Sequence, residues 1–235
     1  MTFMATTYDA LFFDFDGVLA DTVEVKTKAF AQLFEPYGVT IRDRIVEHHR
    51  NHGGMTRVNK FQYYYKNYLQ KPLQDEDLAT LCDAFAKLVV EKVVAAPAIP
   101  GAEEFLRNYQ GRSACFIISG TPDDEIHEIV RQRGWSGYFL EICGAPVTKQ
   151  QHLAILLNRY SLQPKNSLFF GDAITDYEAA NALRVPFVGI LPDENAPLLK
   201  YVPDIMWFKD FNDLKLKNET DDQRKHLGQK VKNSI

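Results

Sequence analysis

The chain has 235 residues, of which 46% are hydrophobic, 12% aromatic and 25% charged. These proportions are typical of globular proteins and exclude a collagen-like chain, a coiled coil and an intrinsically disordered chain. The net charge of −4 argues against a general nucleic-acid binder, which needs a basic face. The three cysteines are too few and too scattered for a disulfide framework or a zinc site, so we expect buried thiols in a reducing compartment.

We expect no secretory signal peptide, because residues 1–7 contain no basic segment followed by a long apolar one. The longest apolar runs are far shorter than a membrane span. These features predict a cytoplasmic protein without membrane or nucleic-acid partners, either a monomer or a small homo-oligomer. The length predicts one large domain or two small ones.

The first predicted element is a strand at Ala10–Phe13, a short apolar run that ends in acidic residues and Gly17. The stretch that follows carries helical stripes of apolar residues and no clear strand as far as about residue 95. It ends in Ala95–Gly101, whose Pro and Gly residues predict a linker and a turn. We therefore predict an inserted helical unit of about 75 residues.

Three further apolar runs predict strands, at Ala114–Ile118, Leu168–Phe170 and Pro186–Ile190. Helical patterns separate these runs. Strands that alternate with helices predict an α/β fold with a parallel sheet and right-handed crossovers. In such sheets, ligands bind beyond the carboxyl ends of the strands.

The predicted organisation has three parts. Residues 1–20 and 96–214 form the α/β core, and residues 21–95 form the helical insertion. Residues 215–235 are polar and charged with few apolar residues, so we expect a charged C-terminal tail there.

Two acids follow the first strand, at Asp14 and Asp16. Side chains two residues apart on a strand point the same way, so we expect both carboxylates in one pocket. Gly17 would allow the chain to turn sharply after them. Burying two acids is costly unless they serve a function. For this motif alone, a simple polar strand end is an equally good interpretation.

Further polar residues follow the other predicted strands. Ser119 and Gly120 offer a hydroxyl and free backbone N–H groups to an anion, and Lys149 offers a positive charge suited to phosphate. Asp172 and Asp176 add acids after a third strand. Each residue has a plain alternative as a turn, a solvated charge or a helix N-cap. Together they predict a site that holds a phosphate and a hard cation.

The predicted crowding of carboxylates calls for a cation. Two carboxylates about 4 Å apart repel by roughly 4 kcal/mol at an effective dielectric constant near 20. Mg²⁺ fits, because it prefers oxygen ligands and is often held by one or two carboxylates together with a substrate phosphate. No His or Cys lies among these acids in the sequence motifs, which disfavours zinc.

These motifs resemble, in order, the four motifs of the haloacid dehalogenase superfamily, in its magnesium-dependent phosphatase and phosphomutase branch. The first is Asp14–Thr22, the second Ser119, the third Lys149 and the fourth Gly171–Asp176. The resemblance implies a Rossmann-like core and Mg²⁺ as cofactor. It also implies that the helical insertion is a cap and that the reaction passes through an aspartyl-phosphate.

The resemblance also implies roles for the residues. Asp14 would attack phosphorus, and Asp16 would protonate the leaving oxygen and then activate water. Mg²⁺ would be held by Asp14, the backbone carbonyl of Asp16 and Asp172, while Asp176 would orient metal-bound water or Lys149. The implied phosphate-binding groups are Ser119, Gly120 and Lys149.

One stretch of the insertion is a candidate for substrate selection. Gly53 and Gly54 break a helix, and Arg57 and Lys60 follow the break. Gly54–Arg57 looks similar to a cap segment that contacts the sugar phosphate in β-phosphoglucomutases. We expect Gly54, Arg57 and Lys60 to bind substrate, with the two cations holding a second anionic group. The alternative is a solvated helix face.

The same family pattern bears on the reaction. Haloacid dehalogenases and phosphonate hydrolases lack an acid at the position of Asp16, which makes both unlikely here. Lys26 and Gly171 stand where mutases of this kind have His and Glu. We predict a phosphatase acting on a small phosphorylated metabolite such as a sugar phosphate. A sugar phosphomutase is the alternative, followed by a non-catalytic phosphate-binding protein.

Overall fold

The computed structural model describes residues 8–212 and 214. The predicted tail, residues 215–235, lies outside the described residues. The chain forms one parallel sheet with the strand order β3-β2-β1-β4-β5-β6. The strands are β1 (Ala10–Phe13), β2 (Ala114–Pro122), β3 (Glu141–Ala145), β4 (Ser167–Gly171), β5 (Phe187–Ile190) and β6 (Trp207–Phe208). The predicted α/β class with a parallel sheet is confirmed.

Alternating side chains of the central strands bury both faces of the sheet. Leu11 and Phe13 face one layer, while Phe12 faces the other. The first layer contains α5 (Ala102–Tyr109) and α6 (Asp123–Gln132), and the second contains α7 (Lys149–Arg159) and α8 (Ile174–Ala182). The short α9 (Pro197–Tyr201) lies beside α8. This double coverage explains why the strands are continuous apolar runs.

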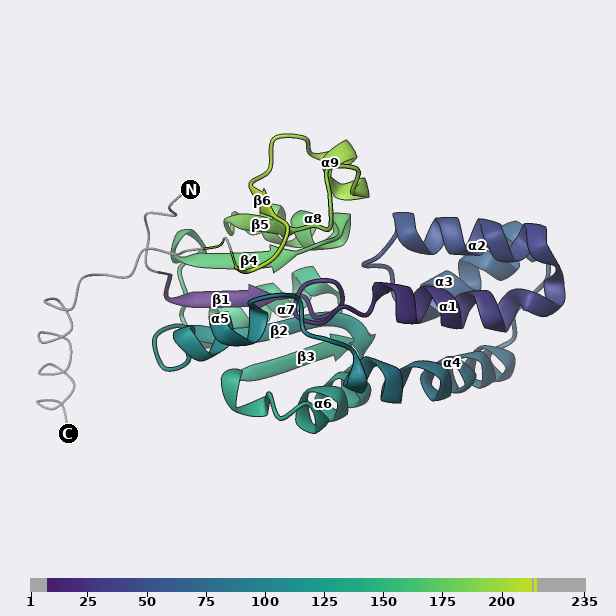
Figure 1. Ribbon diagram of the computed structural model, residues 1–235, viewed down its shortest axis with the longest axis horizontal. Helices are drawn as coiled ribbons and strands as arrows, with labels where there is room; N and C mark the ends of the chain where they lie inside the picture. The colour runs from purple at the N-terminus through teal and green to yellow at the C-terminus, as the bar shows by residue number, and fades with distance from the viewer. Residues whose placement is uncertain (1–7, 213, 215–235) are drawn as a thin grey trace, which may run out of the picture.

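Four helices separate β1 from the rest of this core, and Figure 1 shows them beside the sheet at the carboxyl ends of its strands. They are α1 (Val23–Phe34), α2 (Val39–Asn51), α3 (Arg57–Tyr64) and α4 (Asp75–Ala95). We call residues 23–95 the cap. The structure describes all of these residues and places no strand among them, as the helical stripes predict. Short helical turns lie at Glu35–Tyr37, Tyr65–Leu69, Ser136–Tyr138 and Pro164–Asn166.

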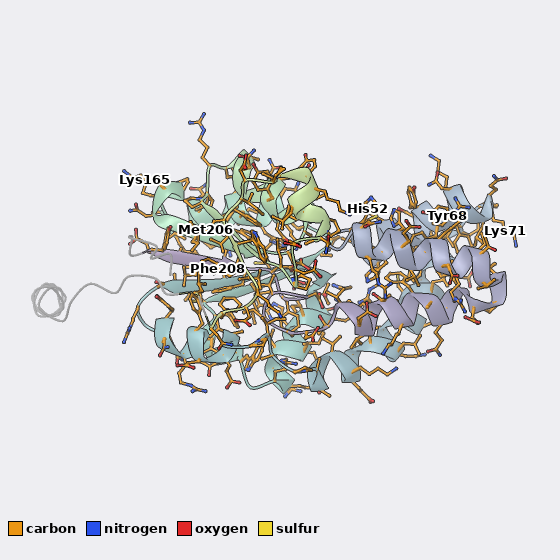
Figure 2. All side chains as sticks on the ribbon, turned by 45° about the horizontal axis from the view of Figure 1, so that its top comes forward. His52, Tyr68, Lys71, Lys165, Met206 and Phe208 are labelled. Atoms are coloured by element: carbon orange, nitrogen blue, oxygen red, sulfur yellow. The ribbon has the colours of Figure 1, made fainter. Side chains whose placement is uncertain are left out.

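Aromatic side chains fill the interior of the cap. The ring centroids of Phe30 and Phe85 lie 4.4 Å apart, and Phe34, Phe61 and Tyr64 are fully buried around them. Aromatic contacts of this kind give a small helical bundle a large buried apolar area. The cap therefore has its own core and presents one end to the sheet. His52 lies at that end, whereas Tyr68 and Lys71 lie at the opposite end (Figure 2).

The cap and the core meet closely at the loop between α2 and α3. A Cβ atom added to Gly54 would lie 1.7 Å from Thr175 Oγ1, at the start of α8, so only glycine fits this contact. In the core, Gly17 has φ +76° and its added Cβ would lie 2.5 Å from Asp172 Oδ2. Because they have no side chain, Gly54 lets the loop between α2 and α3, and Gly17 lets the turn after β1, lie close to the segment that follows β4.

Two smaller findings concern the expected thiols and membrane spans. Cys115 and Cys143 are buried as predicted, but Cys82 on α4 is only partly buried, because the outer side of that helix faces solvent. Within the described residues, no helix is long and apolar enough to cross a lipid bilayer.

Candidate active site

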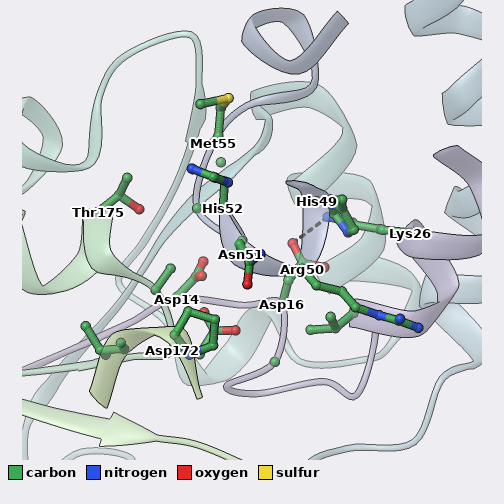
Figure 3. A pocket seen from close by; sticks show the side chains of 18 of the residues that line it. Asp14, Asp16, Lys26, His49, Arg50, Asn51, His52, Met55, Asp172 and Thr175 are labelled. Carbon is green, nitrogen blue, oxygen red and sulfur yellow. Dashed lines mark hydrogen bonds and ion pairs between the residues drawn. The ribbon is translucent and has the colours of Figure 1, made fainter. Parts of the chain in front are cut away.

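A cavity of about 520 Å³ lies between the carboxyl ends of the strands and the cap. The core lines it with the end of β2 and with the segments that follow β1, β4 and β5. The cap lines it with α1, the end of α2, the loop to α3, and residues of α3 and α4. Figure 3 shows Asp14 and Asp172 on one side of the cavity. Asp16, joined to Lys26 by a dashed line, lies on the other side. Most of the residues that the sequence motifs single out therefore share one cavity.

Asp14 occupies the first position after β1 and is 4% exposed. Its backbone N–H donates to the Phe170 carbonyl, which extends the sheet pairing by one residue and fixes the side chain. One carboxylate oxygen accepts from the Phe15 N–H at 2.7 Å, and the other lies 2.9 Å from Lys149 Nζ. Burial raises the pKa of Asp14 to about 7, against the opposing effect of the Lys149 charge.

Lys149 is the first residue of α7, and the Thr148 N-cap with its capping box fixes where that helix begins. Its ammonium lies 2.6 Å from Asp176 Oδ1 and 2.9 Å from Asp14 Oδ2. Burial alone would lower the pKa of Lys149, but the two carboxylates outweigh it and raise that pKa. Lys149 is therefore a permanent buried cation beside the candidate nucleophile.

Asp16 has different partners. Its carboxylate lies 2.5 Å from Lys26 Nζ and accepts hydrogen bonds from Thr22 Oγ1 at 2.6 Å and Thr121 Oγ1 at 3.1 Å. Burial would raise the pKa of Asp16, but the Lys26 charge and these hydrogen bonds lower it overall. Asp16 lies beyond the end of β1, so it reaches the cavity from the turn that follows the strand and not from the strand itself.

Asp14, Asp172 and Asp176 each place one carboxylate oxygen within 4.8 Å of the others. Asp176 uses both of its oxygens within the protein, one toward Lys149 and one to accept from the Ala173 N–H at 3.1 Å. Asp14 and Asp172 line the cavity and Asp176 does not, so Asp14 and Asp172 are the candidate ligands. Burial, followed by repulsion from Asp14, raises the pKa of Asp172 well above its usual value. This all-oxygen set, with Asp14 buried and Asp172 partly buried, fits a hard divalent cation, whose charge would keep both acids ionised.

The last residues of β2 differ in detail from their predicted role, and the strand continues to Pro122, beyond its expected end at Ile118. Ser119 is buried, and its hydroxyl accepts a hydrogen bond from the Thr121 N–H at 3.1 Å. Gly120 and Thr121 line the cavity. Thr121 also accepts a hydrogen bond from Lys26 Nζ at 2.8 Å. The sequence motif Ser119–Thr121 includes Thr121 but predicts no separate role for it, although its hydroxyl at the strand end was a usable signal.

The two cap cations have different surroundings. Arg57 forms a two-pronged ion pair with Glu125 on α6, with distances of 2.7 and 2.5 Å. Lys60 is 1% exposed, and its Nζ lies 2.6 Å from His49 Nδ1. Both residues line the cavity, and so does Gly54. The partnership of Arg57 with Glu125 could not be read from the sequence, since 68 residues separate the two.

We expect the Arg57–Glu125 pair to stabilise the contact between cap and core. A double-mutant cycle with Arg57→Met and Glu125→Gln should give a coupling of about 1–3 kcal/mol in the free energy of unfolding measured with urea. The side chains are 6% and 21% exposed, so solvent screens the pair weakly. The Arg50–Glu24 pair, at 54% and 57% exposed, provides the control and should couple by less than about 1 kcal/mol. Equal coupling in both cycles would contradict the assignment.

Comparison with known proteins places this site in a family. Residues 11–190 match the haloacid dehalogenase-like hydrolase family. A probable pseudouridine-5'-phosphatase of Drosophila melanogaster is 25% identical over 193 residues, which are 77% of this chain and 80% of that protein. The match spans the core and the cap together.

Two solved structures share the fold. The β-phosphoglucomutase of Clostridium difficile superposes with a TM-score of 0.72 at 18% identity, over 96% of this chain and 99% of that one. The hydrolase YfnB of Bacillus subtilis, bound to magnesium, superposes with a TM-score of 0.65 at 17% identity, over 87% and 96% of the two chains. The predicted family and its hydrolase class are confirmed. The chain belongs to the haloacid dehalogenase-like hydrolase family.

Proposed function

We propose that this hydrolase is a Mg²⁺-dependent phosphatase that acts on a small phosphorylated metabolite through a phosphorylated Asp14. The observation that carries the proposal is the buried Asp14 carboxylate, held by Lys149 at 2.9 Å inside an acid cluster in the cavity between core and cap. The pseudouridine-5'-phosphatase relative supports phosphate-ester chemistry, and the magnesium in YfnB supports the metal.

In the first step, a carboxylate oxygen of Asp14 attacks phosphorus. The new bond forms between that oxygen and phosphorus, and the ester bond between phosphorus and the leaving oxygen breaks. The ammonium of Lys149 offsets the negative charge that gathers on the phosphoryl oxygens. Gly120 lines the cavity, and its backbone N–H is a further candidate donor to the phosphoryl oxygens. Asp14, Asp172 and the backbone carbonyl of Asp16 would hold Mg²⁺, which supplies positive charge to the phosphate oxygens when bound.

Asp16 moves the protons in both steps. The lowered pKa makes it a carboxylate in the free enzyme, and the negative charge of an arriving phosphate favours its protonated form. The protonated Asp16 gives its proton to the leaving oxygen. It then takes a proton from the water that attacks the phosphorylated Asp14, and free phosphate leaves as the Asp14 carboxylate is restored. Lys26 and Thr121 both contact the carboxylate of Asp16 and keep it in position.

The cap has the role of excluding bulk water while the ester is bound. The tight contact between Gly54 and Thr175 and the Arg57–Glu125 pair both support a closed arrangement of cap and core. An assay of phosphate release over a panel of phosphorylated metabolites with Mg²⁺ tests the proposed activity. The absence of turnover on every ester, with the protein folded, would contradict it.

Replacing Asp16 tests its role as acid and base. We expect Asp16→Asn to lower kcat by about 10²–10⁴-fold for an alkyl phosphate, whose leaving oxygen needs a proton. The loss should be smaller for p-nitrophenyl phosphate when phosphorylation of Asp14 is measured in a single turnover, because its leaving group needs little protonation. Equal losses for both esters in that step would mean that Asp16 only positions other groups.

Mutase chemistry is the second candidate, because the fold superposes on a β-phosphoglucomutase over nearly the whole chain. A mutase keeps the phosphorylated aspartate from water long enough to pass the phosphoryl group to a second sugar hydroxyl. We favour hydrolysis, since Lys26 and Gly171 replace the residues typical of mutases. Free phosphate should therefore appear as fast as substrate disappears. Interconversion of sugar phosphate isomers with much slower phosphate release would favour the mutase.

A further inference from the structure

Lys60 on α3 is a buried lysine with no carboxylate in direct contact. Burial, followed by repulsion from Lys26, lowers the pKa of Lys60 to about 7, against the opposing charges of Asp16 and Asp172. The Lys60 side chain lines the cavity although the residue is only 1% exposed. Within residues 8–212 and 214, no carboxylate lies within 4.0 Å of its Nζ. An uncompensated buried charge is costly, and proteins normally pair such a group or assign it a function.

The close neighbours of Lys60 do not neutralise it. His49 Nδ1 lies 2.6 Å from Lys60 Nζ and accepts its hydrogen bond. Burial and the nearby Lys60 charge lower the pKa of His49 to about 2, so the imidazole is neutral. The Phe30 ring lies 5.5 Å from the ammonium. His49 therefore fixes the direction of the Lys60 side chain while leaving its charge unmatched.

The other buried or half-buried cations that line the cavity are already paired. Lys149 contacts Asp14 and Asp176, and Lys26 contacts Asp16. Arg57 has both arms of its guanidinium on Glu125. A ligand anion that bound Arg57 would compete with this pair, whereas Lys60 still lacks an anionic partner. Of the two cap cations expected to hold a second anion, Lys60 is therefore the better suited.

We infer that the natural substrate carries a second anionic group, a carboxylate or a second phosphate, and that Lys60, oriented by His49, binds it. The inference rests on the proposed phosphatase function, since the first anion is the phosphoryl group at Asp14. Binding of the second anion would supply the direct counter-charge that Lys60 lacks and would favour its charged form. An ammonium acts as a point charge and does not require the bidentate geometry that a guanidinium prefers, so either a carboxylate or a phosphate could bind it.

A panel of matched esters tests this on the wild-type enzyme with Mg²⁺. Phosphoglycerate is compared with glycerol phosphate for a carboxylate, and fructose bisphosphate with fructose monophosphate for a phosphate. We expect kcat/KM to favour the doubly anionic ester by about 10- to 100-fold in at least one pair, as for a charge-assisted hydrogen bond. The pair that shows the preference identifies the kind of anion.

Variants at Lys60 assign the preference to its charge. Within the preferred pair, Lys60→Met should reduce the ratio of kcat/KM for the doubly anionic ester to that for its singly anionic partner to near one. A loss of activity that is equal for both esters does not change this ratio. Lys60→Arg should restore part of the ratio. Lys66→Met, which removes an exposed cap lysine outside the cavity, should leave the ratio unchanged.

Three outcomes would overturn the inference. The first is a wild-type enzyme that hydrolyses p-nitrophenyl phosphate or pseudouridine phosphate but shows no preference within either pair; the phosphatase function would then stand. The second is a ratio that Lys60→Met leaves intact. The third is the absence of turnover on every ester, which would overturn the proposed function as well. If Lys60→Met fails to fold, the wild-type ratios still decide whether a second anion is recognised.

Discussion

Replacing Asp14 with Asn should lower kcat by about 10⁴-fold or more, because an amide oxygen is too weak a nucleophile to attack phosphorus. The fold should survive the change. Burial already raises the pKa of Asp14 to about 7, so its neutral form is close in free energy to its ionised form. The amide also keeps the size of the carboxylate, and Lys149 keeps its contact with Asp176.

The measurement combines steady-state hydrolysis with circular dichroism and urea unfolding of Asp14→Asn. Asp9→Asn serves as the matched control. Asp9 comes directly before β1, its side chain is exposed, and it lies outside the cavity. We expect the control to retain wild-type activity. Activity of folded Asp14→Asn within about tenfold of the wild type would exclude Asp14 as the nucleophile.

Removal of divalent metal should have the second largest effect. Asp14, Asp172 and Asp176 place oxygens within 4.8 Å of one another, and Lys149 is the buried cation in direct contact with two of them. A bound phosphate would add further negative charge to the same space. We therefore expect chelation to lower kcat by about 10²-fold or more, since the charge of the metal stabilises the transition state.

Adding Mg²⁺ back after chelation should restore activity in full. Ca²⁺ should restore little, because it prefers more ligands at longer distances than Mg²⁺ does. Asp172→Asn should raise the Mg²⁺ concentration needed for half-maximal activity, because it removes a charged candidate ligand. Full activity after thorough metal removal, verified by elemental analysis, would contradict the proposed cofactor.

The sheet could be predicted where its strands are buried on both faces. Ala10–Phe13 is a continuous apolar run that ends in acids, and the strand has these same bounds. β3 was missed because Glu141 and Gly144 interrupt its short apolar pattern at the edge of the sheet. β6 was missed because two residues carry no periodicity. Edge strands have fewer buried neighbours, so their sequences are less constrained.

The site residues that could be predicted are those that come directly after a strand, because the strand itself places their side chains. This holds for Asp14 and Asp172, which share the cavity as expected. Pairings between distant segments could not be predicted, because they depend on how the cap sits on the core. The contact of Lys26 with Asp16 and that of Arg57 with Glu125 are of this kind. In the sequence, Lys26 stands out only because mutases have His at that position. Its contact with Asp16 depends on the three-dimensional structure.

The central claim is that Asp14 carries the phosphoryl group during turnover. The most direct test is an acid-quench experiment. The wild-type enzyme is mixed with Mg²⁺ and an ester that it hydrolyses, the reaction is quenched in acid within a single turnover, and the peptides are mapped by mass spectrometry. We expect a phosphoryl group on the peptide that contains Asp14, located to that residue by fragmentation. The adduct should form no more slowly than phosphate is released, and it should be absent in Asp14→Asn. Rapid release of phosphate with no phosphorylated Asp14 at any quench time would contradict the account.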